Sequence, residues 1–344
     1  MTGWKQRCAR ARSGTSGGSA SVGLLFDWQR RGLVFAPDGR HEWMHSHAQN
    51  PTMLKVDGAL RVYFNCRAAR DASGNTSAYA TFVDLDAADP LRVMAVARQP
   101  VLGLGDCGTF DQFGVMAGSV IRNGAEVWMY YVGWARALGV PYHHAIGIAV
   151  SRDGGQTFTR RARGPALTRT PAEPFIQNSP FVCRIGAVYH MWYSSGTEWI
   201  AQPGAAPESI YVVMHATSQD GLAWERDGVP CIANRVEFEC QTNPSVLRIG
   251  SRYHMWFCYR HGVDFRNVER GYRIGYAWSD DLATWHRDDA AGGFEVAPEG
   301  WDSEMVCYPN VHQIDDRLVM FYSGNYFGRD GFGMAECAMP PQEP

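Results

Sequence analysis

Residues 243–250 read Asn-Pro-Ser-Val-Leu-Arg-Ile-Gly and residues 253–258 read Tyr-His-Met-Trp-Phe-Cys, which is an apolar strand, a glycine turn and an aromatic strand in succession. Four similar segments begin at residues 50, 117, 179 and 308, and an aromatic strand follows each of them. The copies align on Pro51, Gly118, Pro180, Pro244 and Pro309, and these five anchor residues are 67, 62, 64 and 65 positions apart. A nearly constant period of this kind indicates a repeat architecture.

Each repeat continues into further strands. Residues 146–154 and 213–221 are apolar segments that end in Asp-Gly, which indicates a hairpin after a third strand. A short fourth strand follows, for example at residues 228–232. The fifth repeat ends after its third strand, at residues 332–336, whereas residues 28–37 read as an isolated fourth strand. We therefore predict an all-β, five-bladed β-propeller with four antiparallel strands per blade, whose last blade is closed by an N-terminal strand.

Composition limits the classes of function. The 344 residues are 45% hydrophobic and 12% aromatic and carry a net charge of −3, which excludes a disordered chain and a polycationic nucleic-acid binder. No apolar run reaches the roughly 18 residues of a membrane span. The nine cysteines include no Cys-x-x-Cys pair, which fits a reducing compartment. We predict a cytoplasmic protein without nucleic-acid or membrane partners, in which residues 1–21 form a mobile leader and residues 22–344 form one domain; the oligomeric state stays open.

Acidic residues recur at fixed distances before the anchor residues. The innermost strands of a propeller converge on a central funnel, so residues entering these strands face its mouth. The positions seven residues before the anchors hold Met44, Asp111, Glu173, Glu237 and Asp302, and the positions five before hold Ser46, Phe113, Phe175, Glu239 and Glu304. Converging carboxylates raise one another's pKa, which lets an acid and a base coexist near neutral pH. We predict catalytic roles first for Asp111 and Glu304, then for Glu239 and Glu173; the alternative is that some of these groups pair with arginines.

Other polar and aromatic residues in the same segments suit a sugar site. His45 and His47 alternate and would share one face of a strand, where a hydrogen-bonding pair is favoured over a metal pair. Aromatic rings stack on sugar rings, while amides and charged groups bind hydroxyls. The further predicted substrate-binding residues are Gln49, Asn50, Arg67, Trp134, Gln177, Asn178, Gln241, Asn243, Arg260, Trp301, Tyr308 and Asn325. Arg67 and Arg260 either grip a phosphate or carboxylate or neutralise funnel carboxylates. No metal-ligand spacing or phosphate loop is present, so no metal or cofactor is predicted.

The anchor pattern, the Met-Trp-Tyr strands and the Ser-x-Asp-Gly turns resemble the five-bladed propeller glycosidases. These are glycoside hydrolase families 43 and 32 and their relatives, including the family 130 mannoside phosphorylases. Families 43 and 32 place a catalytic Asp directly before the first-blade proline, where this chain has Asn50. The family 43 acid would fall near Gln177 or Asn178, which are not acidic either. The resemblance therefore implies the fold and a carbohydrate funnel without transferring the usual catalytic triad.

We predict a carbohydrate-active enzyme that cleaves or transfers a glycosidic bond by carboxylate acid/base chemistry on a small-molecule or oligosaccharide substrate. A first alternative is a phosphorylase or transferase that uses a sugar phosphate or nucleotide sugar, with one carboxylate as the acid. A second alternative is a non-catalytic glycan-binding propeller, which Asn50 favours. Phosphate dependence of turnover would separate the first two interpretations, and binding without turnover would support the third.

Overall fold

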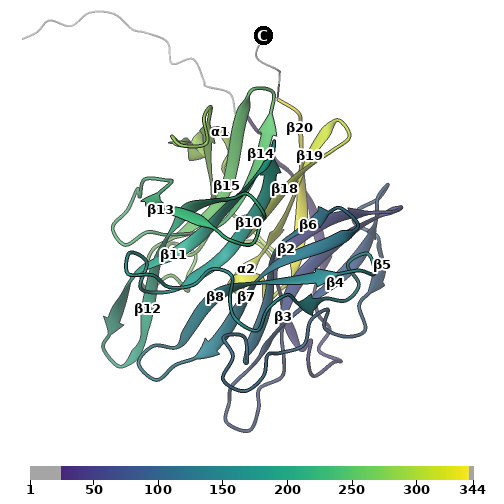
Figure 1. Cartoon of the computed structure of the whole chain (residues 1–344). Helices are drawn as coiled ribbons and strands as arrows, with labels where there is room; N and C mark the ends of the chain where they lie inside the picture. Colours follow the sequence, from purple (N-terminus) through teal and green to yellow (C-terminus); the bar gives the residue numbers. More distant parts are fainter. Residues whose placement is uncertain (1–24, 341–344) are drawn as a thin grey trace, which may run out of the picture.

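Twenty strands and two four-residue helices make up residues 25–340, the part of the chain that this computed structural model describes (Figure 1). The predicted all-β class is confirmed. The two helices are α1 (Asp289–Gly292) and α2 (Asn325–Gly328). The leader predicted at residues 1–21 lies outside the described residues.

The strands form antiparallel groups that follow the sequence repeats. The first group contains β2 (Ser46–Val56), β3 (Ala59–Arg67), β4 (Ala78–Asp86) and β5 (Val93–Val96). The second contains β6 (Gly114–Asn123), β7 (Glu126–Arg136), β8 (Tyr142–Ser151) and β9 (Thr159–Arg160). One parallel pair, Ala78 with Gly114, joins these two groups into an eight-stranded sheet.

The remaining strands form three four-stranded sheets. One contains β10 (Gln177–Ile185), β11 (Val188–Gln202), β12 (Ala205–Ser218) and β13 (Glu225–Pro230). Another contains β14 (Cys240–Ile249), β15 (Arg252–Arg260), β16 (Arg273–Ser279) and β17 (His286–Arg287). The last contains β18 (Cys307–Ile314), β19 (Arg317–Ser323) and β20 (Phe332–Ala338) together with β1 (Gln29–Phe35). Here β1 pairs antiparallel with β20, so the N-terminal strand completes the C-terminal sheet.

Two-residue loops connect the first and second strands of every group. One residue of each loop takes a positive φ, namely Gly58, Gly124, Gly186, Gly250 and Asp315, at 72°, 61°, 62°, 61° and 54°. Such backbone angles match the twist of the flanking strands in tight hairpins. The turn chemistry of the repeats therefore fixes the register of each strand pair.

The first strands of successive groups pack against one another. Strand β2 contacts β6, β6 contacts β10, β10 contacts β14, β14 contacts β18, and β18 contacts β2. Buried aromatic side chains fill the space between neighbouring groups, with Trp192 and Trp256 fully buried. The tyrosines of the second strands also reach the next group, since Tyr63 donates to the Gly155 carbonyl at 2.7 Å and Tyr130 donates to the Gly221 carbonyl at 3.0 Å.

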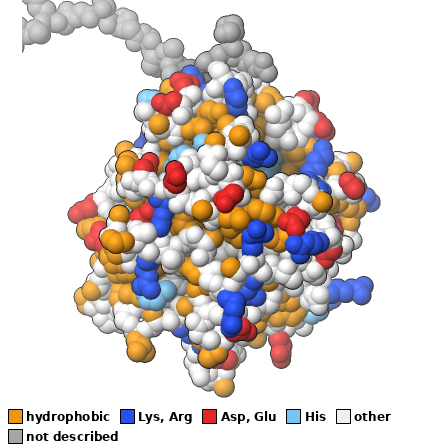
Figure 2. Space-filling model, in the orientation of Figure 1, with side chains coloured by type: hydrophobic (Ala, Val, Ile, Leu, Met, Phe, Trp, Pro, Cys, Tyr) orange, Lys and Arg blue, Asp and Glu red, His pale blue; other side chains and the backbone are white. Residues whose placement is uncertain are grey.

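The face of the molecule shown in Figure 2 has no large patch of a single charge. On the face shown in Figure 2, basic and acidic side chains are interspersed. Among residues 25–340, no helix has the length and apolar character that crossing a bilayer requires.

Candidate functional site

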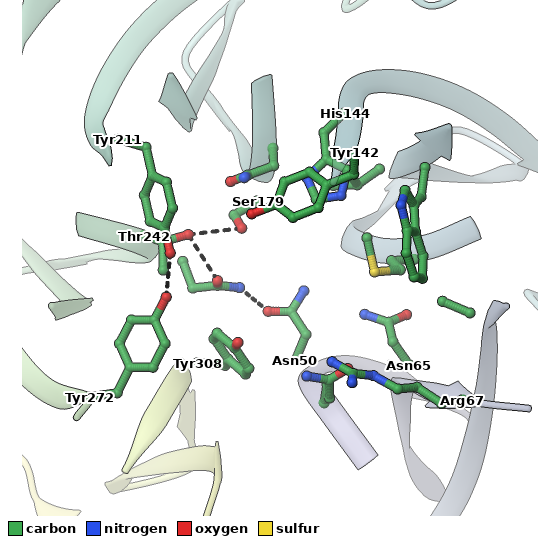
Figure 3. Close-up of a pocket in the computed structure, with 17 residues that line it drawn as sticks. Asn50, Asn65, Arg67, Tyr142, His144, Ser179, Tyr211, Thr242, Tyr272 and Tyr308 are labelled. Atoms are coloured by element: carbon green, nitrogen blue, oxygen red, sulfur yellow. Dashed lines mark hydrogen bonds between the residues drawn. The ribbon is translucent and has the colours of Figure 1, made fainter. Parts of the chain in front are cut away.

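A cavity of about 310 Å³ opens where the first strands β2, β10, β14 and β18 begin (Figure 3). We call it the amide-lined cavity. Its lining residues are Gln49, Asn50, Asn65, Arg67, Ala78, Met116, Val132, Trp134, Tyr142, His144, Asn178, Ser179, Tyr211, Thr242, Asn243, Tyr272 and Tyr308.

The residues directly before four anchor prolines enter the cavity in a strained conformation. Asn50, Ser179, Asn243 and Tyr308 have φ of 61°, 50°, 51° and 60°. The strand register also shifts at each of these places, as it does beside Gly118. A β-bulge bends the strand and redirects a side chain, and a left-handed non-glycine residue costs about 1–3 kcal/mol. The fold thus maintains strain at four equivalent positions that surround one cavity.

Amide groups are joined in a network at the centre of the cavity. The Asn243 side chain donates a hydrogen bond to Oδ1 of Asn50, and Asn50 Nδ2 donates to the Ala117 carbonyl at 2.9 Å. Asn65 Nδ2 donates to the same carbonyl at 3.0 Å. Asn50 therefore acts as a bridge between two repeats. An amide at this position binds hydroxyls but cannot serve as a base or a nucleophile.

Tyrosine hydroxyls form the opposite side of the cavity, across from Arg67 in Figure 3. The Tyr211 and Tyr272 hydroxyl oxygens are 2.5 Å apart. Behind them, Arg260 Nη2 donates to the Tyr211 hydroxyl at 3.0 Å. Burial raises the pKa of both tyrosines, so they are neutral hydrogen-bonding groups at physiological pH.

Arg67 is the permanently charged side chain of the lining. Its Nε donates to Gln49 Oε1 at 3.2 Å, and burial lowers the pKa of Arg67 from its usual value. The neighbouring His47 is held neutral, because burial and the charges of Arg67 and Arg329 lower its pKa to about 3. This side of the cavity therefore carries positive charge.

Three of the predicted catalytic carboxylates lie outside the lining and bind arginines. Asp111 accepts hydrogen bonds from Tyr131 at 2.9 Å and from Arg160 at 2.7 Å, and its side chain is fully buried. Glu173 is bound in the same manner by Tyr193, Ser195 and Arg226, and Glu239 by Arg287, Gln241 and the backbone of Arg235. Asp302, at the position equivalent to Asp111, pairs with Tyr322 and Arg30. Their catalytic roles stay predictions, and these contacts favour the alternative of arginine pairing.

Glu304 differs from the other carboxylates because it is partly exposed. It hydrogen-bonds Tyr326 and interacts with Arg329, the same arginine that acts on His47. Glu304 does not line the cavity. It is the predicted catalytic residue that stays accessible.

The structure brings half of the predicted substrate-binding residues to the cavity. Those that line it are Gln49, Asn50, Arg67, Trp134, Asn178, Asn243 and Tyr308. Those outside the lining are His45, His47, Gln177, Gln241, Arg260, Trp301 and Asn325. Gln177 and Gln241 are buried and point back to Glu173 and Glu239, while Trp301 stacks on Tyr322. The substrate-binding roles of all fourteen residues stay predictions.

Several lining residues were missed in the sequence. They are Asn65, Ala78, Met116, Val132, Tyr142, His144, Ser179, Tyr211, Thr242 and Tyr272. Ser179 could have been found, because it precedes an anchor proline as Asn50 and Asn243 do. Tyr211 lies inside β12 and Tyr272 directly before β16, so no repeat-wide pattern marks them. Among residues 25–340, no group of three or more His, Cys, Asp or Glu side chains is arranged to hold a metal ion.

Comparison with known proteins gives two relatives and many solved structures. No family model matches. "Uncharacterized protein MT1551" and "Uncharacterized protein Rv1502", from two strains of Mycobacterium tuberculosis, are each 34% identical over 311 residues, which is 90% of this chain and 98% of the relative.

The similar solved structures are glycosidase-like propellers. A structure named "Glycoside hydrolase" is 17% identical with a TM-score of 0.70, covering 91% of this chain and 92% of that one. A structure of the GH130 family of mannoside phosphorylases is 14% identical with a TM-score of 0.69, covering 96% and 98%. A thermostable family-43 glycoside hydrolase is 16% identical with a TM-score of 0.59, covering 85% and 88%. At these identities the likeness shows the fold, and it confirms the resemblance to propeller glycosidases.

Proposed function

The chain belongs to the protein family of Mycobacterium tuberculosis Rv1502 and MT1551, and from its own cavity we propose that this family member is a carbohydrate-active protein that binds a saccharide there. The main observation that supports this proposal is the chemistry of the amide-lined cavity. Side-chain amides, hydroxyls and the Trp134 ring surround it, which are the groups that bind sugar hydroxyls and stack on sugar rings.

The fold that supports this function is, in our proposal, one domain with five blades in a closed ring. The contacts of β2, β6, β10, β14 and β18 run from each first strand to the next and return from β18 to β2, which supports ring closure. The pairing of β1 with β20 supports a last blade made from both ends of the domain. The cavity would then lie on the axis of the ring.

We favour saccharide binding over a hydrolytic mechanism that would use a pair of carboxylic groups. A glycosidase of that kind needs two carboxylic groups on either side of the scissile bond. Among the described residues, no carboxylate lines the cavity. Asp111, Glu173 and Glu239 are buried against arginines, where protonation or substrate contact would break an ion pair.

The test is saccharide binding by a glycan array followed by calorimetry. We expect the wild-type protein to bind a defined set of saccharides, and Trp134→Ala to weaken that binding at least tenfold because the stacking surface is lost. Trp43→Ala is the matched control, since Trp43 is also half-buried but packs on Tyr79 outside the cavity. Failure of the wild-type protein to bind any saccharide, or equal binding by Trp134→Ala, would overturn the proposal.

A second candidate is transfer or phosphorolysis with a single acid, Glu304. The partial exposure of Glu304 and its hydrogen bond to Tyr326 favour it. One acid is enough when phosphate or an activated sugar supplies the other reactant. Products would be measured by mass spectrometry with and without inorganic phosphate, for the wild-type protein, Glu304→Gln and the exposed control Glu299→Gln. Turnover that depends on Glu304 and not on Glu299 supports this candidate, and turnover that survives Glu304→Gln refutes it.

A further inference from the structure

Arg67 lies partly buried in the cavity wall without an acidic partner. Its side chain donates to the neutral Gln49 Oε1, and within residues 25–340 no carboxylate lies at ion-pair distance from it. Taking a charge out of water costs several kcal/mol unless an opposite charge compensates. A guanidinium held in this way has unused donors directed at whatever fills the cavity.

Three other arginines that are shielded from water pair with carboxylates of this chain. Arg287 pairs with Glu239 at 2.5 Å, Arg160 with Asp111 at 2.7 Å, and Arg61 makes two bonds of 2.7 Å to Asp84. Arg260 is buried without a carboxylate, but backbone carbonyls, a tyrosine hydroxyl and an aromatic ring contact its guanidinium. Arg67 has neither kind of compensation, because Gln49 is its one side-chain acceptor among the described residues, which indicates that its partner comes from outside the chain.

A second cation lies behind the opposite wall. Arg260 is 4% exposed and donates to the carbonyls of His261 and Gly262 and to the Tyr211 hydroxyl, and its guanidinium lies 3.5 Å from the centre of the Phe265 ring. No carboxylate of the described residues pairs with it. Its positive charge lies beside the Tyr211–Tyr272 hydroxyl pair that lines the cavity.

We propose that the saccharide bound in the amide-lined cavity is acidic, and that Arg67 binds its carboxylate or phosphate-ester oxygens. This inference rests on the proposed saccharide binding and adds the class of ligand. A guanidinium fork matches both oxyanions with two parallel hydrogen bonds, which an ammonium cannot reproduce. Glu304, the accessible carboxylate, is engaged with Tyr326 and Arg329 rather than with Arg67.

The experiment compares matched acidic and neutral saccharides. The probes are glucuronate and galacturonate, alone and in oligosaccharides, hexose 6-phosphates, and the neutral glucose and galactose counterparts of each. We expect the acidic member of a pair to bind at least tenfold more tightly to the wild-type protein. Comparing the affinities for the uronates with those for the hexose 6-phosphates then identifies which oxyanion the protein prefers.

The variants assign that preference to one residue. Arg67→Gln is expected to bind both members of a pair equally, and Arg67→Lys to keep part of the preference because it retains the charge but not the fork. Arg70→Gln is the control, since Arg70 is exposed and three positions away. If Arg67→Gln does not fold, a titration with NaCl on the wild-type protein serves as the test instead. We expect added salt to weaken the binding of the acidic saccharide more than that of its neutral counterpart.

Two results would overturn the inference. One is equal or better binding of the neutral members by the wild-type protein, which would leave saccharide binding itself intact. The other is an acid preference that survives in Arg67→Gln. Absence of any saccharide binding would instead remove the proposed function together with the inference.

Discussion

The side-chain amide of Asn243 donates a hydrogen bond to Oδ1 of Asn50, joining two residues that are 193 positions apart in the chain. Both residues precede an anchor proline and both have a positive φ. The contact therefore connects equivalent positions of two repeats across the cavity. A side chain that holds the cavity together in this way is positioned before any ligand arrives, which lowers the ordering cost of binding.

Replacing Asp111 by Asn should destabilise the fold. The variant leaves Arg160 without a compensating charge in a buried site, and breaking such pairs costs about 3–5 kcal/mol. The free energy of unfolding would be measured by urea denaturation. The control is Asp106→Asn, whose partner Arg163 is exposed, and we expect it to cost less than about 1 kcal/mol. Loss of activity without loss of stability in Asp111→Asn would favour the catalytic role instead.

Replacing Gly155 by Ala should weaken the contact between two repeats. Gly155 has φ of 88°, and a Cβ atom would lie 2.2 Å from the Tyr63 hydroxyl. Backbone strain and overpacking together are expected to lower the free energy of unfolding by about 3 kcal/mol. Gly124→Ala also has a positive φ, of 61°, but open space around it, so about 1 kcal/mol is expected there. Equal losses in the two variants would show that the tyrosine contact contributes nothing.

Below about pH 6.5 the free energy of unfolding should decrease as the pH falls, because buried histidines bind protons less readily in the folded state than in the unfolded state. Burial and the charge of Arg252 lower the pKa of His254 to about 4, whereas the unfolded chain binds that proton near pH 6.5. The unfolded state therefore holds more protons between these values, and at pH 5 this costs about 2 kcal/mol.

The variant His254→Gln isolates this contribution. The free energy of unfolding would be measured from about pH 4.5 to 6 for the variant and the wild type. The slope of this free energy against pH should be smaller in the variant, by up to about 1.4 kcal/mol per pH unit. The exposed His286→Gln is the control. An unchanged pH slope in His254→Gln would contradict the assignment.

Thiol reactivity should distinguish Cys107 from the buried cysteines. Cys107 is exposed, whereas burial raises the pKa of the Cys66 and Cys258 thiols to about 12. Because the thiolate is the reactive form, Cys107→Ser should remove one rapidly reacting thiol from the native protein in an aromatic disulfide assay. The buried thiols should react only on unfolding, and an unchanged number of fast thiols in Cys107→Ser would refute the prediction.

More of the fold than of the candidate site could be predicted from the sequence. Proline anchors and turn residues recur, so they reveal strand order and even the isolated strand β1. The acidic positions recur as well, and in the structure Asp111 and Glu173 each accept a hydrogen bond from a second-strand tyrosine, Tyr131 and Tyr193 respectively. The cavity departs from the repeat, because lining residues such as Arg67 and Tyr272 do not recur in all five repeats. Such residues become visible only when the strands are placed in space.

The pairing of β1 with β20 has a consequence for how the chain is made. During translation β1 leaves the ribosome before the other strands of this sheet and β20 leaves it after β19, so the sheet stays incomplete until β20 has been made. Unpaired strand edges are templates for other chains. A polypeptide that stops before Phe332 would leave β1 and β19 open, and we expect a premature stop there to produce aggregates rather than a smaller soluble protein.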